Sequence, residues 1–342
     1  MYIVKFSDYL KDYLKISNTT NKEFAYRVGI TPKHLIDILS DKVELTASLI
    51  DKISIVMGLP SEYIYRIEAN RRLEETIKSY LSKHNLTISN CINKFAYKEL
   101  FKNGWLEFVN KDDKYEVFKD IIKFLRISSP EKIVDDNSEY LYKSKNEKPE
   151  LLALWLEKCY RETMKQKVSK YDKNKIKNLI EIICEEALKN EFNEEYLKQT
   201  LNEYGIYFVM QEDLPGSKIR GAFKVLRDIP AIYLTYKHQR IADIYFALLH
   251  ELAHLKSDYN KAKAKALVSY EKESAEAKAD EMAYNWMVPN EKYNVIKENG
   301  ITKENTENIP LSFVVYRLAC DKKIKYNSEI YQKYNKVVKK HN

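Results

Sequence analysis

Residues 240–255 read RIADIYFALLHELAHL, a mostly apolar run that contains two histidines. Such a run predicts a helix that is buried on nearly every side. His250 and His254 are four residues apart, so both imidazoles project from one helix face about one turn apart. Burying them with the Glu251 carboxylate and no partners would cost on the order of several kcal/mol, and a metal ion supplies the missing partner.

The spacing of the two histidines suits two ligands of a tetrahedral Zn²⁺, and Glu251 is placed to reach a metal-bound water. The third ligand is expected on the next helix, predicted at about Glu273–Val288. Glu276 and Asp280 are four residues apart there and share one face. We assign Glu276 to the zinc and Asp280 to the far ring N–H of a zinc-bound histidine.

Upstream of the histidine helix, three short segments are rich in β-branched and aromatic residues and are separated by turn residues. They are Tyr204–Met210, Arg220–Leu226 and Ala231–Thr235, with turns at 215–216 and 228–230. We therefore expect a small three-stranded sheet. Most of residues 1–200 has helical periodicity, and a last helix is predicted near Ser312–Cys320. The predicted fold class is α+β: an all-α helix-turn-helix domain, a helical middle region, and a C-terminal domain with the sheet and the histidine helix.

Residues 21–40, NKEFAYRVGITPKHLIDILS, match the positional pattern of a helix-turn-helix. Ala25 is the small residue where the helices meet, and Gly29 tolerates the positive φ of the turn. Thr20 begins a capping box for the first helix, and Thr31 with Pro32 begins the second. The apolar positions that pack the pair are Phe24, Val28, Ile30, Leu35 and Ile38.

A helix-turn-helix presents its second helix to base edges and phosphates of double-stranded DNA. The predicted DNA-contacting residues are Asn21, Thr31, Lys33, His34 and Asp37. Residues 1–80 hold 12 Lys or Arg against 11 Asp or Glu, so this domain offers few phosphate contacts. Such a domain binds an operator weakly alone, and we expect a homodimer.

Composition sets the remaining bounds. The chain has 342 residues, 44% of them hydrophobic, and a formal net charge of +8, which favours two or three folded domains over disorder. We expect domains at 1–80 and 149–342, with a helical linker region at 81–148. No apolar run approaches the roughly 20 residues of a membrane span, and the first 15 residues lack a signal-peptide core. A cytoplasmic location without membrane association is predicted.

Together, these motifs resemble two known families. Residues 145–335 resemble the ImmA/IrrE-type zinc metallopeptidases through Ile219–Ala222, Pro230–Leu234, 240–255 and Glu276–Pro289 (EAKADEMAYNWMVP), with Met282 where Phe is usual. That resemblance implies a gluzincin-like metalloendopeptidase with His250, His254 and Glu276 as zinc ligands and Glu251 as general base. Residues 5–75 resemble XRE/Cro-type domains of the HigA antitoxin group, in which Gly58-Leu59-Pro60 and Glu68-Ala69-Asn70 recur.

The first resemblance implies that zinc with three protein ligands keeps one position open for water, as catalytic sites do. The implied substrate is a specific partner protein, such as a repressor or a toxin or antitoxin partner. We expect it to lie extended along an exposed sheet edge, at Ala231–Thr235. Tyr233, Tyr236 and His238 are candidates for oxyanion stabilisation by sequence proximity.

Two alternatives stay open. In one, the chain is a DNA-binding repressor or antitoxin whose zinc site is structural or sensory and which cleaves nothing, since fold does not fix function. In the other, the chain is a zinc-free interaction module.

Overall fold

The computed structural model describes residues 5–106, 112–134, 148–237, 240–264, 266–270 and 277–338. It is a mixed α+β structure in which helices predominate and one small sheet has four strands, so the predicted fold class is confirmed at this level. None of the helices in these ranges combines the length and the apolar character needed to cross a bilayer.

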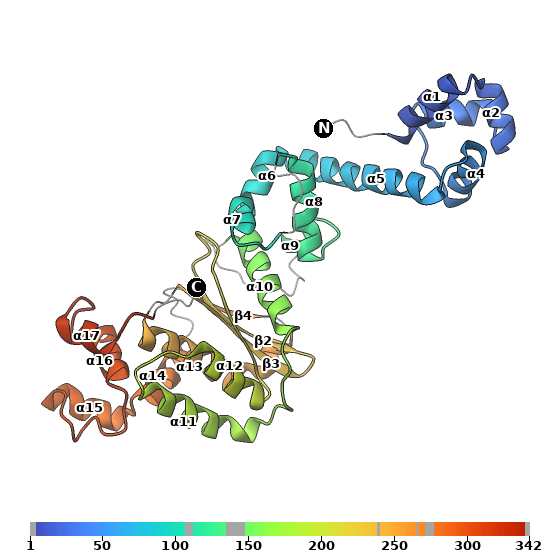
Figure 1. The fold of residues 1–342 in the computed structure, drawn as a ribbon. Helices are drawn as coiled ribbons and strands as arrows, with labels where there is room; N and C mark the ends of the chain where they lie inside the picture. The colour runs from blue at the N-terminus through green and yellow to red at the C-terminus, as the bar shows by residue number, and fades with distance from the viewer. Residues whose placement is uncertain are drawn as a thin grey trace. The chain divides into compact units, whose positions relative to one another are not determined.

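The described chain divides into two compact units (Figure 1). The first holds the residues up to Cys91 with those of 112–119, and the second holds 92–106 and the residues from Asp120 onward. The predicted linker region 81–148 is therefore divided between the two units.

The first unit contains five helices: α1 (Phe6–Ile16), α2 (Asn21–Val28), α3 (Pro32–Leu39), α4 (Ala47–Met57) and α5 (Ser61–Lys83). Helices α6 (Ile88–Lys94) and α8 (Lys114–Leu125) contribute to both units. All five helices, from α1 through α5, contribute buried residues to the core of this unit. These include Leu10, Phe24, Leu35, Ile53 and Ile64.

Helices α2 and α3 are joined by a tight turn at the expected positions. The Thr20 hydroxyl accepts from the Glu23 backbone N–H (3.2 Å), and the Thr31 hydroxyl accepts from that of His34 (3.1 Å). Gly29 ends α2 in the left-handed region with φ +76°. Both predicted N-caps are confirmed. The Glu23 carboxylate, however, pairs with Arg27 one turn along α2, so its predicted return contact in the capping box is replaced by an ion pair.

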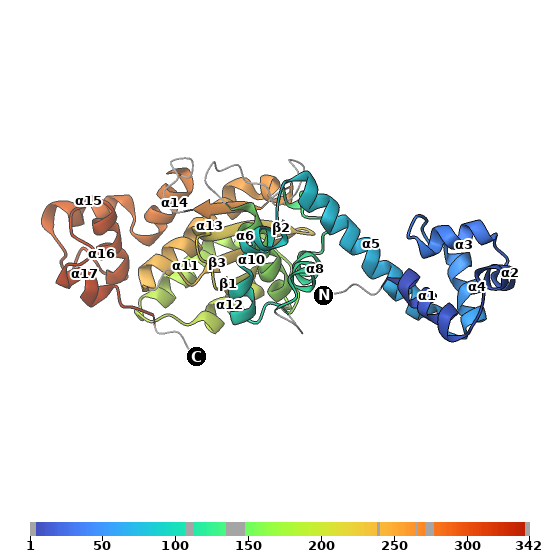
Figure 2. The ribbon, with the colours of Figure 1, turned by 90° about the horizontal axis from the view of Figure 1, so that it is seen from above.

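The second unit contains the sheet and the remaining helices. The strands are β1 (Tyr207–Gln211), β2 (Ile219–Leu226), β3 (Ile229–Thr235) and β4 (Leu267–Tyr270). The helices are α7 (Tyr97–Lys102), α9 (Glu131–Val134), α10 (Pro149–Thr163), the 3₁₀ helix η1 (Lys173–Lys175), α11 (Ile176–Ala187), α12 (Glu194–Glu203), α13 (Ile241–Ala264), α14 (Ala277–Met287), α15 (Asn290–Asn299), α16 (Leu311–Cys320) and α17 (Glu329–Tyr334). In Figures 1 and 2, α13 and α14 lie side by side, with α15 to α17 gathered beyond them.

The strand order is β1-β3-β2-β4, with β1 parallel to β3 and the other pairs antiparallel. Two predictions about the sheet are wrong. The sheet has a fourth strand, and β3 pairs on both sides, so Ala231–Thr235 is central and offers no edge. The β2–β3 turn is Arg227-Asp228, both with positive φ (48° and 70°), which is the backbone of a type I′ hairpin turn.

The two faces of the sheet meet different helices because successive strand residues point to opposite sides. On β3, Ile232 and Leu234 join the core that contains the apolar residues of α13. Tyr233 points to the other face, where its ring meets that of Trp155 on α10 edge to face, with ring centroids 6.3 Å apart. The histidine helix α13 therefore covers one face and α10 the other.

Candidate metal centre

Helix α13 carries the histidine pair. It spans Ile241–Ala264, and nearly every residue from Ile241 to Leu255 is buried, as its apolar sequence predicts. His250 is 5% exposed and Glu251 is 1% exposed, while His254 is partly buried. The burial expected for this helix is confirmed.

The two imidazoles converge on one point. His250 Nε2 and His254 Nε2 are 3.2 Å apart, and the rings meet at 76° with centroids 4.9 Å apart. Two imidazole nitrogens bound to one tetrahedral zinc, each at about 2.1 Å, lie about 3.4 Å apart. The separation of the two nitrogens thus fits a shared metal ion.

Each imidazole has a carboxylate at its other nitrogen. His250 Nδ1 is 2.9 Å from Asp280 Oδ1 on α14, and His254 Nδ1 is 3.3 Å from Asp258 Oδ2 one turn along α13. An ionised carboxylate only accepts, so these contacts favour the tautomer in which each Nδ1 carries the proton and each Nε2 has a lone pair for a metal ion. A cation between the nitrogens satisfies both lone pairs, and carboxylate–histidine pairs of this kind orient metal ligands.

Asp258 is a site residue that the sequence analysis missed. Its backbone is non-helical (φ −124°, ψ 16°), so α13 is kinked there. Although burial opposes ionisation, hydrogen bonds from Lys261, Ser257 and His254 lower the pKa of Asp258 to about 2. The carboxylate is therefore charged at neutral pH. The i, i+4 spacing from His254 to Asp258 was the available signal.

Glu251 packs against the sheet. An ideal Cβ on Gly221 of β2 would lie 2.5 Å from Glu251 Oε1 and 3.0 Å from both Leu234 Cδ2 and the Tyr233 carbonyl oxygen. Such a distance is too short for a real contact, so the absent side chain of Gly221 makes room for the carboxylate. Because the φ of Gly221 is not positive, its backbone conformation does not require a glycine. The close approach of Glu251 explains the glycine at this position.

The start of α13 is capped by a residue from the far end of the chain. Asn335, 0% exposed, accepts from the Ala242 backbone N–H through Oδ1 (2.9 Å) and donates through Nδ2 to Asp243 (3.2 Å) and Tyr331 (2.9 Å). The Ile241 N–H donates to the Lys336 carbonyl (3.1 Å). Burial raises the pKa of Asp243, and the hydrogen bond from Asn335 opposes that rise.

The structure describes four of the five residues predicted for this centre. His250 and His254 lie together, Asp280 contacts His250 as predicted, and Glu251 lies one residue away on α13. Glu276 falls outside the described residues, immediately before α14 in the sequence. Within the described ranges, no group of three or more His, Cys, Asp or Glu is arranged to hold a metal ion. The two described histidine nitrogens fit two ligands of one zinc ion.

The hydroxyls of the two tyrosines suggested for oxyanion stabilisation have other partners, and the expectation is wrong for Tyr233, which lies on the face of the sheet away from Glu251. The Tyr233 hydroxyl accepts from Thr163 (3.2 Å) on the α10 face of the sheet. The Tyr236 hydroxyl donates to Glu194 on α12 (2.6 Å). Strand alternation sends Tyr233 away from Glu251, which sequence proximity could not show. His238 lies outside the described residues.

The predicted DNA-contacting residues lie on or beside the surface of α2 and α3. Asn21, Thr31 and Lys33 are exposed, and His34 and Asp37 are partly exposed. The residues that pack the helix pair are buried: Phe24, Ala25, Val28, Leu35 and Ile38, with Ile30 partly buried. The apolar positions of the pattern are therefore buried or partly buried, and the predicted contact positions are exposed or partly exposed.

Comparison with protein-family models gave no match, and comparisons with curated proteins and with solved structures gave none either. The geometry of the site therefore carries the functional interpretation.

Proposed function

We propose that this chain is a DNA-binding regulator that carries a zinc-dependent endopeptidase acting on a specific partner protein. The observation that carries the proposal is the 3.2 Å approach of His250 Nε2 and His254 Nε2, with a carboxylate on each Nδ1. The helix-turn-helix of α2 and α3 supports the DNA-binding half. The resemblance to ImmA/IrrE-type metallopeptidases and XRE/Cro-type domains agrees with both halves.

The side chains have distinct roles in this proposal. Bound zinc would polarise a peptide carbonyl and acidify a water molecule. His250 and His254 hold the ion through Nε2, and Glu276 is expected to be the third ligand. Glu251 accepts a proton from the attacking water and delivers it to the leaving amine. Asp280 and Asp258 keep the imidazoles in the Nδ1–H tautomer, which leaves Nε2 available to the metal.

The sheet offers the substrate an edge at β4. Among the described strands, β4 pairs with β2 alone. In that pairing Ser269 lies opposite Gly221, the residue against which Glu251 packs. An extended peptide that adds to the outer edge of β4 by main-chain hydrogen bonds would pass at the level of Glu251. This edge replaces the central strand β3 as the proposed substrate platform, and it favours an extended segment of a protein substrate.

Glu251→Gln tests the peptidase. The amide keeps the shape of the side chain but cannot take a proton, so zinc should remain while turnover falls by roughly 10²–10⁴-fold. The measurement is a mass-spectrometric comparison of cleaved peptides in cells that produce either the original chain or the variant. Glu281→Gln, at an exposed position on α14, is the matched control and should leave the cleavage products unchanged.

The same comparison separates the proposal from its main alternative. Cleavage products that persist in the Glu251→Gln strain would contradict the assigned role. A chain that holds zinc and protects an operator, yet generates no cleaved peptide in either strain, would instead be a regulator with a structural or sensory zinc site.

The DNA-binding half predicts a footprint that depends on α3. Replacing Lys33 and His34 together by alanine should weaken operator binding by roughly tenfold or more, because each contact to base or phosphate contributes about 1–3 kcal/mol. Lys15→Ala, an exposed lysine at the end of α1, is the control. A two-fold symmetric protected sequence would agree with the expected homodimer. Equal affinity of the double variant and the control would contradict this role for α3.

A further inference from the structure

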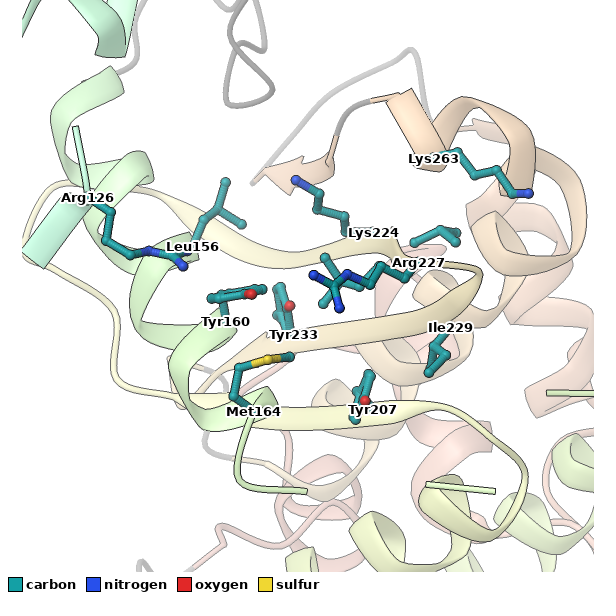
Figure 3. A pocket seen from close by; sticks show the side chains of 12 residues that line it. Arg126, Leu156, Tyr160, Met164, Tyr207, Lys224, Arg227, Ile229, Tyr233 and Lys263 are labelled. Carbon is teal, nitrogen blue, oxygen red and sulfur yellow. The ribbon is translucent and has the colours of Figure 1, made fainter. Parts of the chain in front are cut away.

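The second unit has a cavity that the metal centre does not use. Its volume is about 610 Å³, and it lies on the α10 face of the sheet (Figure 3). Strand alternation separates it from the histidine pair: Tyr233 lines the cavity, while the next residue, Leu234, belongs to the core beneath α13. A volume in the range of roughly 300–1,000 Å³ is typical of sites for small molecules.

Aromatic rings from three elements line this cavity: Tyr160 from α10, Tyr207 from β1 and Tyr233 from β3. Tyr233 is 1% exposed and is fixed by Thr163 and Trp155. Tyr160 and Tyr207 are partly exposed, and the Arg126 guanidinium lies over one face of the Tyr160 ring, 4.4 Å from its centroid. The Tyr207 ring and the other face of the Tyr160 ring are the surfaces that a ligand could meet. Stacking on such rings binds planar groups with little regard to their substituents.

The charged groups that line the cavity are all cationic: Arg126, Lys224, Arg227 and Lys263, with no carboxylate among the described lining residues. Two of them are paired at the rim, because Arg126 binds Glu157 (2.7 Å) and Lys263 binds Asp228 (2.5 Å). Arg227 takes part in no ion pair within the described ranges. In Figure 3, Arg227, Tyr160 and Tyr233 are among the labelled side chains that line the cavity.

The backbone of Arg227 is a second sign that its side chain matters. Arg227 holds φ +48° at the first central position of the β2–β3 turn, where Asn, Asp or Gly is usual. The type I′ turn requires positive φ at this position, and asparagine, aspartate or glycine would adopt that conformation at a lower cost than arginine. Outliers of this kind concentrate at ligand sites.

We propose that this cavity binds a nucleoside phosphate, a small ligand with a planar base and an anionic end. The base stacks on Tyr160 and Tyr207. The phosphate accepts hydrogen bonds from the forked guanidinium of Arg227, which suits bidentate recognition of phosphate, and from the Lys224 ammonium. This binding function is independent of the metal centre and of the proposed peptidase.

Calorimetric titration of the full chain with the four ribonucleoside monophosphates tests the proposal. Adenosine, which lacks the phosphate, and inorganic phosphate, which lacks the base, are the half-ligands used for comparison. At least one nucleotide should bind saturably, and each half-ligand should bind at least tenfold more weakly, because neither engages both the rings and the cations. Arg227→Asn should reduce nucleotide affinity roughly tenfold or more through loss of the charge-assisted hydrogen bonds. Lys303→Gln, at an exposed position beyond α15, should leave affinity unchanged.

The choice of asparagine separates a ligand role from a structural role. Asparagine accepts positive φ better than arginine, so the Arg227→Asn variant should unfold at the same or a higher temperature while losing affinity. Tyr160→Leu, which keeps an apolar side chain but removes the ring, should also weaken binding. No saturable binding of any nucleotide, equal binding of inorganic phosphate, or unchanged affinity in Arg227→Asn would overturn the proposal.

Discussion

At the scale of single residues, the candidate centre depends on close approaches between side chains rather than on unusual residue types. Gly221 has no Cβ, and Glu251 occupies the space that a Cβ would need. Asp280 and Asp258 each contact one imidazole at Nδ1, which leaves both Nε2 atoms facing one point. Gly221 therefore leaves space for Glu251, and the two aspartates orient the two imidazoles.

Gly221→Ala should destabilise the fold by about 1–3 kcal/mol, because the added methyl group collides with the Glu251 carboxylate, Leu234 and the Tyr233 carbonyl. Denaturant unfolding of the full chain measures this cost. The matched experiment repeats the substitution in a Glu251→Ala background, where part of the collision is removed and the cost should fall. An identical cost in both backgrounds would show that Gly221 does not accommodate Glu251.

At the scale of elements, the start of α13 is held by a contact that its own sequence does not supply. Its first turn is capped by Asn335, whose buried amide also binds Asp243 and Tyr331. Near its other end, Asp258 kinks the helix and contacts His254. The position of the histidine pair along the sheet therefore depends on the segment that follows α17.

Asn335→Ala should lower the free energy of unfolding by about 2–3 kcal/mol, because the substitution leaves a buried helix N–H and two other polar groups without their amide partner. Thermal or urea unfolding measures the change. Asn327→Ala, an exposed asparagine ahead of α17, should change stability little. Equal effects of the two substitutions would refute the capping role of Asn335.

At the scale of the whole molecule, features with a local signal were predicted and features set by tertiary pairing were not. The periodicity of residues 240–255 predicted α13, the threonine–glycine pattern predicted α2 and α3, and the four-residue spacing predicted the Asp280 contact. The fourth strand has only four residues, Leu267–Tyr270, between two helices, and is too short to show a period. The strand order, the central position of β3 and the Asn335 cap all depend on contacts between residues far apart in the sequence. A local sequence pattern therefore cannot predict them.

The two units each have a hydrophobic core of their own, as the proposal of two separate activities requires. The helix-turn-helix and the histidine pair belong to different units. Substitutions in α3 should therefore leave the metal centre intact, and substitutions at the histidines should leave operator binding intact.

The central claim is that the Nε2 atoms of His250 and His254 share one zinc ion. Metal analysis of the purified full chain, alongside His250→Ala and a His34→Ala control from α3, tests it most directly. We predict about one zinc per chain in the original protein and in His34→Ala, and a loss of nearly all zinc in His250→Ala, because one of three ligands is removed. Equal zinc in all three proteins, or none in the original protein, would contradict the claim.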